Sequence, residues 1–132
     1  REIWVMLGDG EMQEGQVWEA AMAANYHSVG NLKVMIDRNR IQNDDFLEVQ
    51  MEVGDIAAKL LSFGWVVREI DGHSMPEIVD ALKWAAEIND GPCAIVAHTV
   101  KGKGVSFMEN NPSFHGKAPT DDEFVIAMEE LR

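Results

Sequence analysis

The sequence predicts an α/β fold in which a parallel sheet carries helices on both faces. Short apolar segments, of which residues 3–7 form a continuous apolar run, alternate along the chain with segments whose apolar residues recur at helical spacing. Continuous apolar runs are typical of strands buried on both faces, and their alternation with helices favours right-handed crossovers between parallel strands. Four strands are predicted, at residues 3–7, 32–37, 65–70 and 94–99.

Two helices are predicted in the first half of the chain. Residues 16–26 carry apolar side chains at helical spacing, and Gly30 follows them as a residue type that punctuates structure. Asp55 is placed to cap a short second helix, which stops at Gly64. Each of these helices leads into one of the predicted strands.

Two capping boxes mark the later helices. Ser74 with Glu77 begins a third helix, which ends ahead of Pro92. Thr120 with Glu123 repeats the pattern before a last helix. Two segments have no regular pattern, one rich in Asn and Asp and one of about 20 residues, a length that is usually functional or disordered. They cover residues 39–53 and 100–119.

The composition bounds the class of protein. A length of 132 residues is enough for one domain with a real core, and we expect residues 1–132 to form a single domain. The net charge of −12 argues against nucleic acid and anionic membranes as partners, although an acidic surface also serves plain solubility.

The single cysteine and the hydropathy predict a location. Cys93 lies in an apolar run, which favours a buried, inert thiol, and one cysteine allows no internal disulfide. No apolar stretch reaches the roughly 18 residues of a membrane span. We therefore expect a cytoplasmic protein. The chain begins at Arg1 and enters a strand at once, which is typical of a piece of something longer.

Polar residues follow two of the predicted strands. Gly8-Asp9-Gly10 comes directly after the first strand, and Asn39 and Ile41 come after the second. If the two strands are neighbours, the Asp9 carboxylate, the Asn39 side chain and the Ile41 carbonyl converge at one edge. These are hard oxygen ligands for a small divalent cation, beside glycines that let a diphosphate approach the backbone. The pattern indicates a metal–diphosphate site, whereas the triplet alone fits an ordinary tight turn.

Four segments resemble the transketolase family. They are residues 8–22 (GDGEMQEGQVWEAAM), 37–42 (DRNRIQ), 100–107 (VKGKGVSF) and 114–119 (FHGKAP). The chain is most similar to the amino-terminal subunit of split bacterial transketolases, from its first residue to about Pro119. The resemblance implies a thiamine-diphosphate-binding fold that is truncated at its N-terminus, with only the diphosphate and metal half of the domain present.

The resemblance also implies a role for individual residues. Asp9 binds Mg²⁺ through its carboxylate, Asn39 through its side-chain oxygen and Ile41 through its backbone carbonyl, with Ca²⁺ or Mn²⁺ as possible substitutes. Gly10 meets the diphosphate of thiamine diphosphate through its backbone N–H.

Two residues of the long loop are implied as well. Lys101 and His115 match family positions that contact the cofactor, and His115 is the implied catalytic residue because its position also touches the donor sugar. A lysine suits a diphosphate, and a histidine can bind a hydroxyl or move protons near neutral pH. Without the resemblance, Lys101 reads as part of a solvated loop and His115 as an exposed loop histidine.

The implied function is transfer of a two-carbon ketol unit from a ketose phosphate to an aldose phosphate, with thiamine diphosphate and Mg²⁺, as in the pentose phosphate pathway. The glutamate that activates the cofactor belongs to a pyrimidine-binding domain or subunit. We therefore expect a homodimer or heterotetramer with such a partner. We also expect the isolated chain to be inactive and poorly soluble, because a strand edge and apolar helix faces are left uncovered.

Other interpretations remain open at this stage. The chain could belong to another thiamine-diphosphate enzyme, such as 1-deoxyxylulose-5-phosphate synthase or a 2-oxo acid dehydrogenase component, or be a non-catalytic association module of the same fold. A nicotinamide-binding domain lacks its glycine turn. Residues 43–45, Asn-Asp-Asp, stand where many relatives have a short glycine-containing segment.

Four further residues are interpreted as lying outside the catalytic chemistry. His73 is read as structural, supporting a turn and a helix cap, and His27 and His98 are not expected in the site. Glu14 matches an acidic family position near the dimer interface, but a favourable charge at a helix start is the simpler account.

Overall fold

A computed structural model describes residues 1–43 and 45–132 of the chain. Within these residues, strands lie in the order β1-β2-β6-β5 and form a four-stranded sheet in which all neighbours run parallel. The strands are β1 (Ile3–Gly8), β2 (Leu32–Arg38), β5 (Val66–Asp71) and β6 (Cys93–His98). The predicted parallel sheet is confirmed, and each strand end lies within one residue of the expected position.

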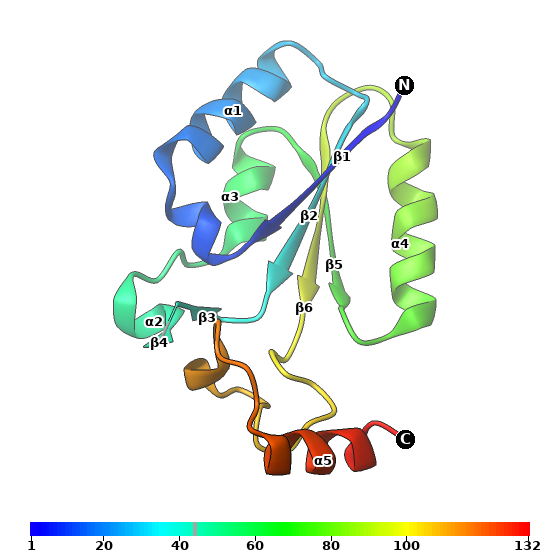
Figure 1. Ribbon diagram of the computed structural model, residues 1–132. Helices are drawn as coiled ribbons and strands as arrows, with labels where there is room; N and C mark the ends of the chain where they lie inside the picture. Colours follow the sequence, from blue (N-terminus) through cyan, green and yellow to red (C-terminus); the bar gives the residue numbers. More distant parts are fainter. Residues whose placement is uncertain (44) are drawn as a thin grey trace.

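Helices cover both faces of the sheet, as predicted (Figure 1). Helices α1 (Gly15–Tyr26) and α3 (Ile56–Ser62) lie against one face, and α4 (Met75–Glu87) lies against the other. Adjacent strand positions point to opposite faces, so Ile36 belongs to the core under α1 and α3 while Ile95 belongs to the core under α4. Burial on both faces explains the continuous apolar run of the inner strand β6, whereas the edge strands β1 and β5 are more exposed.

The remaining elements gather beyond the ends of the strands (Figure 1). We call this end of the sheet the carboxyl edge, where the strands finish at Gly8, Arg38, Asp71 and His98. The elements that follow it are η1 (Gly10–Gln13), β3 (Ile41–Gln42), β4 (Asp45–Phe46), α2 (Leu47–Gln50), η2 (Pro112–Phe114) and α5 (Asp121–Glu130). Ligands of open parallel sheets bind at this end.

The prediction of an irregular segment at residues 39–53 was wrong. Strands β3 and β4 pair there as a short antiparallel hairpin, and α2 follows directly. The backbone N–H of Leu47 donates to the carbonyl of Arg40 at 2.9 Å, and the Leu47 side chain is fully buried. Two-residue strands carry no periodicity, so only tertiary packing defines them. Of the Asn43-Asp44-Asp45 segment, Asp44 lies outside the described residues.

One of the two predicted capping boxes is reciprocal. Thr120 accepts from the N–H of Glu123, and the Glu123 carboxylate accepts from the N–H of Thr120. Ser74 likewise accepts from the N–H of Glu77, but the Glu77 carboxylate accepts from the N–H of Asp71 instead. That contact ties the start of α4 to the end of β5, because the preceding turn brings the two together.

The expected uncovered apolar surface is present on the described residues. Strand β1 is one of the two edge strands of the sheet, and Met6 on it is 66% exposed. Helix α5 exposes large apolar side chains such as Phe124, and Leu131 beyond its end is exposed as well. By contrast, Cys93 is buried as predicted, and burial raises the pKa of its thiol. No helix among the described residues is long and apolar enough to cross a membrane.

Candidate functional site

The two predicted ligand residues lie together at the carboxyl edge. Strand β1 pairs with β2 so that Gly8 lies opposite Asp37. The backbone N–H of Asp9 continues this ladder and donates to the carbonyl of Asp37 at 3.1 Å. Asn39 follows β2 by one residue, which places it beside Asp9. The condition behind the prediction, that these two strands are neighbours, is therefore confirmed.

Asp9 is a buried carboxylate, and its two oxygens have different surroundings. Its side chain is 1% exposed, and Oδ2 accepts from the backbone N–H of Arg40 at 2.6 Å and from the Arg38 guanidinium at 3.2 Å. Burial raises the pKa of Asp9, while the Arg40 N–H and the Arg38 charge oppose that rise. Oδ1 has no hydrogen-bond partner among the described residues. A buried, unpartnered carboxylate oxygen is costly unless a cation meets it.

Asn39 is held in one orientation by its neighbours. Its Nδ2 donates to Oδ2 of Asp37 at 2.8 Å, and its Oδ1 accepts from the backbone N–H of Ile41 at 2.9 Å. A carboxylate only accepts hydrogen bonds, so Asp37 determines which end of the amide faces it. The hydroxyl of Thr99, which follows β6, donates to the other oxygen of Asp37. Ile41 starts β3, and its side chain is buried.

Gly10 lies against a buried amide that the sequence did not indicate. A Cβ atom on Gly10 would come within 2.6 Å of Oε1 of Gln42. That Oε1 is buried and, like Oδ1 of Asp9, lacks a partner within the part of the chain that the structure describes. Gln42 follows Ile41 in β3, so it enters this site through the hairpin that the sequence did not predict.

Arg38 is a second residue that sequence reasoning missed. Its guanidinium contacts Asp9 and also Oε1 of Glu52 at 2.9 Å, and the Arg38 side chain is largely buried. Burial raises the pKa of Glu52, but the N–H of Gly54 and the Arg38 charge outweigh this and lower it. The only sequence signal is that Arg38 directly precedes the candidate Asn39, and an arginine next to a polar residue is too common to mark a site.

Lys101 joins this region, whereas His115 stands apart from it. Lys101 and Asn39 both line a cavity of about 460 Å³ between the sheet and α4, together with Thr99. His115 follows η2 in the long loop and is exposed. Within the described residues its side chain makes no hydrogen bond or ion pair. The contacts of His115 therefore do not link it to Asp9.

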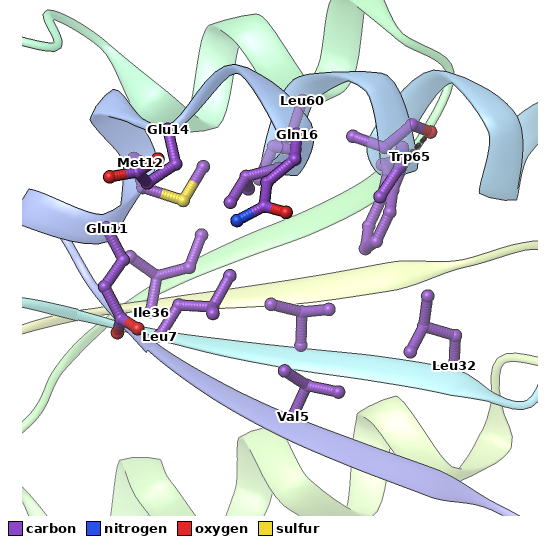
Figure 2. A pocket seen from close by; sticks show the side chains of 14 residues that line it. Val5, Leu7, Glu11, Met12, Glu14, Gln16, Leu32, Ile36, Leu60 and Trp65 are labelled. Carbon is purple, nitrogen blue, oxygen red and sulfur yellow. Dashed lines mark hydrogen bonds between the residues drawn. The ribbon is translucent and has the colours of Figure 1, made fainter.

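A second cavity, of about 400 Å³, lies on the other face of the sheet between α1 and strands β1 and β2 (Figure 2). Apolar side chains from the strands face others from the helical side, namely Val5, Leu7, Ile36, Met12, Leu60 and Trp65. Neither Asp9 nor Asn39 lines it. Its lining therefore supports packing more than polar chemistry, so we place the candidate site at the carboxyl edge.

The donor set at the carboxyl edge is one of mixed oxygens. Groups of three or more His, Cys, Asp or Glu side chains suited to a metal are absent from residues 1–43 and 45–132. The predicted ligand set instead comprises the Asp9 carboxylate, the Asn39 amide oxygen and the Ile41 backbone carbonyl, with the Asp37 carboxylate hydrogen-bonded to Asn39 beside them. Such hard, mostly neutral oxygens suit Mg²⁺ or Ca²⁺ rather than zinc.

The three histidines that the sequence analysis placed outside the catalytic chemistry have local partners, whereas Glu14 makes no cap bond. Nε2 of His98 contacts Oε2 of Glu69 at 2.7 Å, and the ring of His27 packs edge-on to Tyr26. Glu14 immediately precedes α1 and makes no side-chain cap bond there. His73 supports its turn as expected, but its ring also contacts the loop after β6.

Comparison with known proteins identifies what the chain is similar to. Residues 1–131 match the family model "Transketolase, thiamine diphosphate binding domain". One subunit of the apulose-4-phosphate transketolase of Phocaeicola vulgatus is 38% identical over 130 residues, which cover 98% of this chain and 46% of that protein. Human transketolase is 36% identical over 115 residues, covering 87% of this chain and 18% of that protein.

Solved structures agree with these relatives. Transketolase from Campylobacter jejuni superposes with a TM-score of 0.89 at 29% identity, over 99% of this chain and 20% of that one. The chain spans about half the length of the apulose-4-phosphate transketolase subunits and about a fifth of the long transketolases.

Proposed function

The chain belongs to the transketolase family through its thiamine diphosphate binding domain, and we propose that it supplies the metal and diphosphate half of a ketol-transferring site. The observation that carries the proposal concerns Oδ1 of buried Asp9, which has no partner in residues 1–43 and 45–132 and lies beside the oriented amide of Asn39. Within those residues, folding leaves this acceptor without a donor at the edge where parallel sheets bind ligands. A divalent cation bound at Oδ1 would satisfy that acceptor.

In this proposal three residues hold Mg²⁺. Asp9 contributes Oδ1, Asn39 contributes a lone pair of Oδ1 that its bond to the Ile41 N–H leaves unused, and Ile41 contributes its carbonyl. The fit is supported by the chemistry of the donors, because all are hard oxygens and only one is charged. A single carboxylate leaves most of the cation's charge to be balanced by a diphosphate.

Gly10 and Lys101 receive the diphosphate in this proposal. Gly10 opens η1 with no side chain, so a phosphate can approach its backbone N–H. Lys101 lines the same cavity as Asn39 and brings a positive charge. When bound, thiamine diphosphate supplies the nucleophilic carbon that takes up and releases the two-carbon unit. The protein side holds and orients that group.

His115 is proposed as the residue that meets the sugar. It is exposed in the loop before α5, where Lys117 lies 5.0 Å from the ring centre of Phe114. An imidazole there can donate to or accept from a substrate hydroxyl and can move a proton near neutral pH. In this proposal His115 contacts the sugar only once the substrate is bound next to the loop that carries it.

The chain is proposed to act with a partner. Its relatives include proteins named as transketolase subunits, and the chain spans about half of their length. We propose that residues 1–132 are one part of a thiamine diphosphate domain and that a pyrimidine-binding domain or subunit completes the site. Sugar phosphates are the proposed substrates, and Mg²⁺ the proposed ion.

Replacement of Asp9 tests the proposal. In the complete enzyme that contains this chain, Asp9→Asn should weaken Mg²⁺-dependent binding of thiamine diphosphate by at least about a hundredfold, because the charged ligand is lost. Calorimetric titration with both compounds measures this. Asp90→Asn, at an exposed position between α4 and β6, is the matched control and should bind as the natural protein does. Equal affinity of Asp9→Asn and the natural protein would contradict the proposal.

A second measurement addresses the partner. Ketol transfer by residues 1–132 alone should be undetectable, and addition of the completing subunit or domain should restore it. Turnover by the isolated chain would show that it carries a whole site.

A further inference from the structure

His73 lies where the turn after β5 meets the loop after β6. Its Nε2 accepts a hydrogen bond from the backbone N–H of Val100 at 2.7 Å. A ring nitrogen accepts only through a lone pair, so this contact uses an Nε2 that carries no proton. His73 and Asn39 both line the cavity on the α4 side, which places the contact at the carboxyl edge.

The turn that carries His73 is anchored independently of its ring. The backbone N–H of His73 donates to Oδ1 of Asp71 at 2.8 Å, and the N–H of Gly72 donates to the carbonyl of His98 at 2.8 Å. A Cβ atom on Gly72 would come within 2.4 Å of Cγ2 of Thr99, so the turn lies in close contact with the end of β6. The backbone that carries the imidazole is therefore held in place by contacts that do not involve the ring.

The segment that the imidazole holds is tied on its other side to the candidate ligands. Thr99 donates its N–H to the carbonyl of Arg38 at 3.3 Å, and its hydroxyl donates to Asp37. Asp37 in turn accepts from the amide of Asn39. Val100 follows Thr99 and precedes Lys101, so two anchors hold the backbone that leads into Lys101.

We propose that His73 is a positioning residue for the diphosphate site. By accepting the Val100 N–H, it holds the backbone that presents Lys101 beside Asn39. The inference rests on the proposed function, since it assigns Lys101 to the diphosphate. Loss of this acceptor frees the segment on one side while Thr99 still holds it on the other. The result is a displaced Lys101 in a folded protein.

Three variants of the complete enzyme test the proposal. His73→Gln keeps an acceptor oxygen near the position of Nε2, His73→Ala removes it, and His27→Ala removes an exposed histidine at the end of α1 as a matched control. Hydrogen exchange at the Val100 amide, measured without cofactor, reports the contact itself. Exchange should be at least about fivefold faster in His73→Ala and near the natural rate in the other two.

The affinity for thiamine diphosphate at saturating Mg²⁺ reports whether the proposed displacement of Lys101 weakens binding. We expect a loss of about fivefold to tenfold in His73→Ala and less than about twofold in His73→Gln and His27→Ala.

Some outcomes overturn the proposal. Faster exchange in His73→Ala with unchanged affinity would mean that the contact is structural only, and equal exchange in all variants would mean that the contact is absent in solution. If the natural protein fails to bind thiamine diphosphate at all, the proposed function itself is wrong and the role of His73 falls with it.

Discussion

Each end of the sheet holds a charged side chain that is almost fully buried, and the two are hydrogen-bonded differently. Lys33 lies near the start of β2 and is 1% exposed, and its ammonium donates to the carbonyls of Gly30 and Ile88. Asp9, at the carboxyl edge, is also 1% exposed, yet one of its oxygens has no partner in the described part of the chain. The buried ammonium of Lys33 is hydrogen-bonded and therefore supports the fold. The buried carboxylate of Asp9 keeps one oxygen that a ligand can occupy.

The difference follows from which ends of the helices each edge meets. Ile88 caps the C-terminus of α4, where unpaired carbonyls carry partial negative charge and suit an ammonium. We call the end where the strands start the amino edge, with Gly30 and Lys33 beside it. At the carboxyl edge the Arg40 N–H and the Arg38 guanidinium both meet Oδ2 of Asp9, and neither meets Oδ1. The comparison predicts that mutations at the amino edge act on stability and those at the carboxyl edge on binding.

Two glycine replacements give the largest expected contrast. A Cβ atom on Gly30 would lie 1.8 Å from the backbone oxygen of Asn89, so Gly30→Ala should destabilise by about 3 kcal/mol, since backbone must move. On Gly10 the nearest atom is Oε1 of the flexible Gln42 side chain, so Gly10→Ala should cost less than about 1 kcal/mol in stability and should weaken diphosphate binding. Urea unfolding of the complete protein measures the first effect and calorimetric titration the second. Similar losses of stability in Gly30→Ala and Gly10→Ala would contradict the predicted difference between the two edges.

Removing the two buried charges should change stability in opposite directions. Lys33→Met leaves two carbonyls without donors and should lower the free energy of unfolding by about 2 kcal/mol, with Mg²⁺ affinity unchanged. Asp9→Asn removes an incompletely paired buried charge and should raise the stability of the metal-free protein by about 1 kcal/mol at neutral pH. Thermal and urea unfolding in chelator measure both. A less stable Asp9→Asn protein would indicate that Arg38 and Arg40 satisfy the carboxylate fully.

The smallest expected effect is a pH dependence at Asp9. Burial raises its folded pKa above the unfolded value, so the stability it contributes is fully present below the unfolded pKa and is lost as pH rises through the folded pKa. Subtracting the Asp9→Asn profile from the natural one, without metal, should isolate this fall. Mg²⁺ binding should also release a fraction of a proton at acid pH and none at mildly alkaline pH, as calorimetry in two buffers would show. Proton release that is equal at both pH values would exclude Asp9 as the titrating ligand.

The fold was predictable because its signals are local. Apolar runs defined the strands within one residue, and the Thr120–Glu123 box marked the last helix. The β3–β4 hairpin was missed, since its two-residue strands exist only where tertiary contacts hold them. Of the candidate site, the closeness of Asp9 and Asn39 followed from two neighbouring strands. The partnership of Arg38 with Glu52 did not, because it depends on side-chain direction.

The sequence by itself determined the alternation of strands and helices, the family and the residues at the carboxyl edge, since periodicity, caps and short motifs are encoded within a few positions. Tertiary structure alone decided that Oδ1 of Asp9 is left without a partner among the described residues, that Asp37 orients Asn39, and that His73 reaches the Val100 amide. Those facts depend on contacts between residues far apart in the chain. Only packing the sheet brings such donors and acceptors within hydrogen-bonding distance.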